Sequence, residues 1–105
     1  MRKNLVVTLG VLLILVSASS LLAADGAALF KAKCAGCHGP DGTAQTAVGK
    51  NLKIRSFAGA DVQKQSDGEL TKIIEEGKGK MPAFKGKLTG AEISALVKQI
   101  RSLKK

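Results

Sequence analysis

The sequence contains no Trp and no Tyr, and three Phe are its only aromatic residues among 105 positions. A chain of this length forms at most one small domain. With so few bulky side chains, such a domain has little material to fill a hydrophobic interior. We therefore expect a bound apolar group to supply part of the core, and the polypeptide without that group to be largely unfolded.

Cysteine and histidine are also scarce, since the chain has two Cys and one His. All three fall in one stretch, Cys34-Ala35-Gly36-Cys37-His38. A zinc site needs four ligands, and the sequence holds no further Cys or His to complete one. A thioredoxin-like dithiol needs a strand-rich scaffold, and the sequence has no alternating β-branched run to build it. The sequence therefore disfavours both readings of the two cysteines.

The same stretch matches the Cys-x-x-Cys-His signature of covalent haem attachment. If the segment is helical, its two Cys and its His share one face and can meet one flat ligand. Thioether bonds from Cys34 and Cys37 would hold the porphyrin, and His38 would be an axial ligand of the iron. We therefore predict one covalently bound haem c with its iron.

A second axial ligand cannot be another imidazole, because His38 is the only His. Met81 is the only Met besides the initiator, and it lies in a Gly-rich loop, 77–84, between two predicted helices. A Met in a polar loop has no core to fill, and Pro82 holds it out of helical geometry. We predict Met81 as the second iron ligand. The alternatives are a chance loop Met, a Lys ligand from 78, 80 or 85, or an open iron position.

Acidic residues are few, with 8 Asp and Glu against 17 Lys and Arg, for a formal charge of +9. An excess of this kind favours nucleic acid, an anionic membrane surface or an acidic protein as partner. Nucleic acid is disfavoured because no aromatic residues that could stack on bases are interleaved with the lysines. We expect a basic rim near the ligand-bearing segments that steers acidic redox partners, formed by Lys33, Lys50, Lys80, Lys85 and Lys87.

The first 24 residues read as a secretory signal of the Sec type. A basic start, residues 1–4, precedes the apolar run 5–16 and a group of small residues. We therefore predict a signal peptide at 1–24, a mono-haem domain at 25–105 and export to the periplasm. The competing interpretation is an uncleaved anchor that holds the domain at the periplasmic face of the membrane, since no charge occurs between Lys3 and Asp25.

Helix signals dominate the rest of the chain and predict an all-α fold. Asp25 is a plausible N-cap for a helix over 26–33. Capping boxes at Ser66-Asp67-Gly68-Glu69 and Thr89-Gly90-Ala91-Glu92 open helices over 67–76 and from 90 to the end. A shorter helix is expected over 57–64, capped by Ser56. The polar stretch 39–49 is expected to be a loop.

Two helix faces carry further expectations. Gly26 and Phe30 lie four residues apart on one face, and a Gly in a helix is best explained by another helix crossing there. The outer face of the last helix is expected to be solvated, and it carries Lys98, Arg101, Lys104 and Lys105.

From Asp25 onwards the chain resembles the small, soluble bacterial class I c-type cytochromes. The resemblance rests on Phe30 four residues before Cys34, on the stretch 34–39, and on Gly79-Lys80-Met81-Pro82. It implies that the first and last helices cross, which places Gly26 and Phe30 against Leu96, Val97 and Ile100. It also aligns Gly49-Lys50-Asn51-Leu52 with the family's Gly-Pro-Asn-Leu, where the carbonyl at the Pro position accepts a hydrogen bond from the axial His. Lys50 replaces that Pro here.

An iron with two protein ligands has no vacant position for a substrate, and the chain has no second His to move protons. We therefore predict a monomeric single-electron carrier rather than an enzyme. The alternatives are a peroxidase-like or ligand-binding haem protein in which Met81 is labile, and a haem subunit docked to a larger enzyme.

Overall fold

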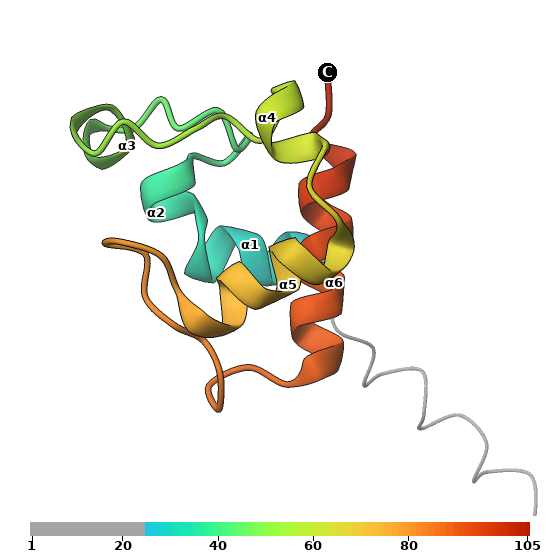
Figure 1. Cartoon of the computed structure of the whole chain (residues 1–105). Coiled ribbons are helices and arrows are strands. Elements are labelled where there is room, and N and C mark those ends of the chain that lie inside the picture. The colour runs from blue at the N-terminus through green and yellow to red at the C-terminus, as the bar shows by residue number, and fades with distance from the viewer. Residues whose placement is uncertain (1–24) are drawn as a thin grey trace, which may run out of the picture.

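The computed structural model describes residues 25–105, and helices dominate this part of the chain (Figure 1). The predicted all-α class is confirmed, because the only extended pairings within 25–105 are two isolated bridges in the loop before the last helix. The predicted signal segment, 1–24, lies outside the described residues. The helices are α1 (Gly26–Lys33), α2 (Ala35–His38), α3 (Ala47–Asn51), α4 (Ala60–Gln63), α5 (Asp67–Glu76) and α6 (Gly90–Ser102).

The longer helices begin where their capping residues predict. Asp25 Oδ1 accepts a hydrogen bond from the Ala28 N–H at 3.1 Å and opens α1. Thr89 and Glu92 form the reciprocal capping box of α6, with bonds of 3.1 and 2.9 Å. Ser66 caps α5 by accepting from the Glu69 N–H at 3.1 Å, but only this half of the predicted box is present.

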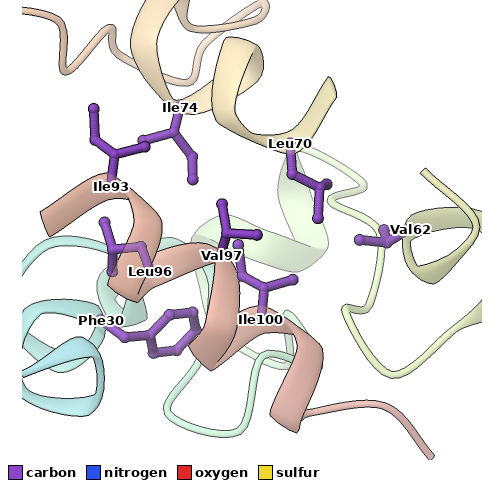
Figure 2. Close-up of a cluster of buried hydrophobic side chains, with 8 residues drawn as sticks. All are labelled: Phe30, Val62, Leu70, Ile74, Ile93, Leu96, Val97 and Ile100. Carbon is purple, nitrogen blue, oxygen red and sulfur yellow. The ribbon is translucent and has the colours of Figure 1, made fainter. Parts of the chain in front are cut away.

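Helix α6 forms the centre of the fold, because it contacts both α1 and α5. The α1–α6 crossing is close: a Cβ on Gly26 would overlap the backbone carbonyl of Ala95. Phe30 is 2% exposed and Leu96 1% exposed at this crossing. Figure 2 shows the buried cluster around α6, formed by Phe30, Val62, Leu70, Ile74, Ile93, Leu96, Val97 and Ile100. The predicted crossing of α1 and α6 is confirmed, and Phe30, Leu96, Val97 and Ile100 all belong to the buried cluster, whereas Gly26 meets Ala95.

The bounds and cap predicted for one short helix were wrong, and so was the end of the predicted loop over 39–49. The helix expected over 57–64 covers only Ala60–Gln63, and its N-cap is Gly59. Ser56 instead accepts a hydrogen bond from the Ala58 N–H at 3.1 Å, which stabilises a turn before the helix. The stretch 39–49 is not all loop, because α3 begins at Ala47 with Thr46 as its N-cap.

Arg101 does not lie on a solvated face as predicted, because its guanidinium binds the segment between α4 and α5. Nη1 donates to the Gln63 carbonyl at 2.9 Å, and Nη2 donates to the Gln65 carbonyl. Nε and Nη2 also donate to Asp67 Oδ1 at 3.0 and 2.9 Å. Gln63 Nε2 in turn donates to the Ile100 carbonyl at 2.9 Å, so this segment and α6 are joined from both sides.

Candidate haem site

A cavity of about 590 Å³ lies beside the core, a volume typical of sites for organic ligands. All four residues predicted from the sequence to hold a haem line this cavity: Cys34, Cys37, His38 and Met81. They come from two segments more than forty positions apart, around α2 and after α5. The fold therefore gathers the predicted residues around one space.

The two cysteines are positioned by the junction of α1 and α2. The Cys34 N–H donates to the Phe30 carbonyl at 2.8 Å, and the Cys34 carbonyl accepts from the His38 N–H at 3.0 Å. Neither Cys34 nor Cys37 is in a disulfide, and Cys37 is exposed. Burial raises the pKa of the Cys34 thiol, so Cys34 lacks the stabilised thiolate of a reactive redox cysteine.

The His38 imidazole is held by packing alone. Its ring stacks on the Phe57 ring, with centroids 4.5 Å apart and planes 21° apart. Its Nδ1 atom is buried and has no hydrogen-bond partner within residues 25–105. Burial lowers the pKa of the imidazole, which favours the neutral form. The neutral imidazole is the form that binds a metal ion.

The hydrogen bond to His38 that the resemblance implies is absent from the described residues. The Lys50 carbonyl, at the family's Pro position, instead accepts from the Lys53 N–H at 3.3 Å. Helix α3 is tied to α2 by Thr46, whose Oγ1 donates to the Cys37 carbonyl at 2.7 Å. The same oxygen accepts from the Gly49 N–H at 2.8 Å. The segment expected to support His38 is thus fixed against α2 by Thr46.

Met81 lies in a tight turn fixed to the end of α5. The Met81 N–H donates to the Lys78 carbonyl at 2.9 Å, and the Lys78 N–H donates back to the Met81 carbonyl at 3.2 Å. Gly77 ends α5 with φ of 76°, a left-handed conformation that suits Gly. The Phe84 N–H then donates to the Ile74 carbonyl at 3.0 Å and returns the loop to the helix. Met81 is half-buried and packs against the core cluster.

The cavity wall is mostly apolar and its charges are all positive. Apolar lining comes from Leu52, Ile54, Phe57, Val62, Leu70, Ile73, Ile74, Phe84 and Ile100. No Asp or Glu within residues 25–105 lines the cavity. Five basic residues do, named here the cavity cations: Lys33, Lys53, Arg55, Lys78 and Lys80.

Only two members of the predicted basic rim, Lys33 and Lys80, line the cavity. Lys53 and Arg55 were not among the predicted residues. Their signal is the alternation of apolar and basic residues over 51–55, which is too short to predict an element of secondary structure. In the structure the segment 52–55 runs along the cavity, and all four of its residues line it: Leu52, Lys53, Ile54 and Arg55.

These residues fit a covalently bound haem c. The apolar wall suits a porphyrin, and the two thiols are free to form thioether bonds. A neutral imidazole and a thioether sulfur are both known iron ligands. Within residues 25–105, no group of three or more His, Cys, Asp or Glu side chains is arranged to hold a metal ion by itself. In the same range no helix has the length and hydropathy needed to cross a bilayer.

Comparison with known proteins gives consistent matches. Residues 22–100 match the family model described as cytochrome c oxidase, cbb3-type, subunit III. Cytochrome c6 of Nostoc sp. (strain PCC 7120) is 40% identical over 96 residues, which cover 83% of this chain and 79% of that protein. Cytochrome c6 of Anabaena variabilis is 38% identical over 74 residues, covering 66% and 77%.

A solved structure, the KustC0563 c-type cytochrome, is also similar to this chain. It is 43% identical, and the superposition covers 77% of this chain and 99% of that one with a TM-score of 0.72. This chain is therefore similar to nearly all of that structure, both in sequence and in fold.

Proposed function

The chain belongs to the class I c-type cytochromes, which carry covalently bound haem c, and we propose that it carries single electrons between redox proteins. The proposal assigns thioether attachment to Cys34 and Cys37 and axial ligation to His38 and Met81. Its main support is the convergence of these four side chains on one apolar cavity.

The bound haem supplies a one-electron couple between ferrous and ferric iron, and a thioether ligand raises its reduction potential relative to two imidazoles. The protein's task is to hold the two ligands in place in both oxidation states. Phe57 stacks on the His38 ring and supports its orientation, and the turn over 78–81 fixes the backbone that carries Met81. The apolar wall excludes water, so little solvent has to reorganise when the charge changes.

Optical spectra of the purified protein test the ligation. With Met81 on the iron, the oxidised protein shows the weak far-red band of Met–iron bonding, and the reduced protein binds carbon monoxide slowly. The Met81→Ala variant should lose the band and bind carbon monoxide rapidly. Wild-type protein that lacks the band and binds carbon monoxide as fast as the variant would contradict the carrier proposal and favour a ligand-binding or peroxidase-like haem protein.

A second candidate function is a haem subunit of a larger enzyme, because the matching family model is named after an oxidase subunit. The matches to cytochrome c6 favour a free carrier instead. Gentle purification from the source membrane and periplasmic fractions distinguishes the two. A free carrier elutes as a monomer, whereas a subunit co-purifies with a fixed enzyme partner.

Lys33, Lys78 and Lys80 at the cavity give the carrier a basic face for acidic redox partners, and attraction of this kind speeds encounter. The rate of electron transfer to an acidic partner should therefore fall steeply as salt is added, since at 0.1 M ionic strength salt screens the attraction between exposed charges more than about 10 Å apart. A rate that is insensitive to ionic strength would contradict a steering role.

We further propose that 1–24 is a cleaved export signal and that 25–105 is the mature haem domain, located in the periplasm. The apolar run over 5–16 after a basic start supports this assignment. N-terminal sequencing of the exported protein tests it. A mature N-terminus near Asp25 is expected, whereas an intact Met1 in the membrane fraction would show an anchor.

A further inference from the structure

We propose that Lys53 and Arg55 form a cationic pair that binds the propionate carboxylates of the haem. The inference rests on the proposed attachment through Cys34 and Cys37 and extends it to the opposite edge of the porphyrin. Both side chains line the cavity and are exposed. The sequence has no Trp or Tyr that could serve the propionates instead.

Neither basic side chain has another partner within residues 25–105. The one ion pair there joins Arg101 and Asp67, and neither of these residues lines the cavity. No carboxylate from the described part of the chain lines it either. Exposed cations at the rim of an apolar cavity attract a ligand that is apolar in its body and negatively charged at one edge. Two haem propionates would supply that opposite charge.

The backbone at Lys53 also points to a functional side chain. Lys53 has φ of 54°, a left-handed conformation that residues other than Gly rarely adopt. It ends α3 in a Schellman motif: the Ile54 N–H donates to the Gly49 carbonyl at 2.9 Å, and the Lys53 N–H donates to the Lys50 carbonyl at 3.3 Å. Gly is the usual residue at this position. A Lys there bears conformational strain, and its side chain reaches the cavity wall.

Covalent attachment orients the porphyrin, and this orientation indicates which of the cavity cations can reach the propionates. The vinyl groups that react with Cys34 and Cys37 lie on one half of the ring, and the propionates lie on the other. Lys33 adjoins Cys34, so it belongs to the vinyl half. Lys78 and Lys80 are part of the turn that presents Met81. Lys53 and Arg55 belong to neither segment, so they are the cations free to meet the propionate edge.

The test is the pH dependence of the reduction potential of the haem-loaded protein. Protonation of a propionate removes negative charge near the iron, so the potential falls as pH rises through the propionate pKa. Nearby cations keep a carboxyl pKa low. In the Lys53→Gln/Arg55→Gln variant, the midpoint of this fall should move to higher pH by about one unit. Lys53→Arg and Arg55→Lys keep the charges and should retain the wild-type midpoint.

The control is Lys72→Gln, which removes an exposed charge on α5 away from the cavity. It should leave the midpoint unchanged. Other titratable groups at the cavity are Lys33, Lys78, Lys80 and the haem-binding side chains, so Lys78→Gln/Lys80→Gln is the rival variant. An unmoved midpoint in the Lys53/Arg55 variant, or an equal move in the rival, would overturn the proposal.

If the double variant does not mature, the two single variants carry the test, because each removes one of the two charges. Mass spectrometry of every sample establishes haem attachment first. Wild-type protein without covalent haem counts against the attachment proposal. Protein with haem and an unmoved midpoint counts only against the propionate site.

Discussion

At the haem site, a single aromatic ring connects the proposed axial histidine to the hydrophobic core. Phe57 stacks on His38 and also meets Phe30 edge-on, with ring centroids 6.0 Å apart and planes 64° apart. Phe30 lies at the crossing of α1 and α6. Because His38 Nδ1 has no hydrogen-bond partner in the described chain, this packing is what sets the orientation of the imidazole.

Replacing Phe57 should therefore weaken the protein more than replacing another ring at the cavity. We expect Phe57→Leu to lower the unfolding free energy of the haem-loaded protein by about 2 kcal/mol, including the loss of aromatic pairing. Phe84→Leu is the matched control, because Phe84 lines the cavity without pairing to another ring. Denaturant titration measures both. Equal losses in the two variants would show that the ring contacts of Phe57 contribute nothing of their own.

Arg101 was expected to be solvated, but its side chain makes several hydrogen bonds within the protein. Its hydrogen bonds to Gln63, Gln65 and Asp67 hold the α4–α5 segment on α6. We expect Arg101→Gln to cost about 2 kcal/mol of unfolding free energy, since bonds from a charged donor to backbone carbonyls are lost. Lys98→Gln, an exposed change on the same helix, should stay within about 0.5 kcal/mol of wild type. A similar small effect at Arg101 would mean that these bonds merely replace bonds to water.

At the scale of helices, the elements with local signals were predictable. The starts of α5 and α6 follow from capping residues three positions apart, which are read within one turn. The spacing of Cys34, Cys37 and His38 likewise predicts haem attachment from neighbouring residues alone. Met81 could be selected only by elimination, and the sequence did not indicate what anchors its loop.

Other elements depend on contacts that a local pattern does not contain. Helix α3 has no apolar periodicity, and it is stabilised by Thr46, which bonds to the Cys37 carbonyl nine positions earlier. Arg101 finds its partners 34 to 38 positions away, so its spacing on α6 looked like that of a solvated cation. The left-handed backbone of Lys53 could not be predicted either, because the residue after a helix C-cap is usually Gly when its backbone is left-handed.

The crossing of α1 and α6 allows a direct test at the element scale. Gly26→Ala would normally favour a helix, but its methyl group would overlap the Ala95 carbonyl. We expect a net loss of about 2 kcal/mol of unfolding free energy from overpacking. Gly90→Ala is the control, because a Cβ at the start of α6 meets nothing within 4 Å. Thermal unfolding of both variants checks this, and an unchanged Gly26→Ala protein would show that the crossing is looser than described.

On the scale of the whole molecule, the core and the haem cavity are parts of one interior. Four members of the buried cluster also line the cavity: Val62, Leu70, Ile74 and Ile100. An unfilled space of about 590 Å³ in a chain with three aromatic residues would leave this interior poorly packed. We therefore expect the haem to complete the core as well as to carry the electron.

Protein made without haem should consequently be largely unfolded. We expect the Cys34→Ser/Cys37→Ser variant to show no cooperative thermal transition by circular dichroism and no dispersed amide spectrum by NMR. Met81→Ala is the control, because it leaves the thioether attachment in place and should still melt cooperatively. A well-folded variant without haem would refute the dependence of the fold on the cofactor.

The central claim, covalent haem at Cys34 and Cys37, is tested most directly by mass spectrometry of the purified, exported protein. The intact mass should exceed that of the mature polypeptide by one haem, and a digest should place the added mass on the peptide that contains both cysteines. A bare polypeptide mass, or haem that separates from the chain on denaturation, would contradict the account.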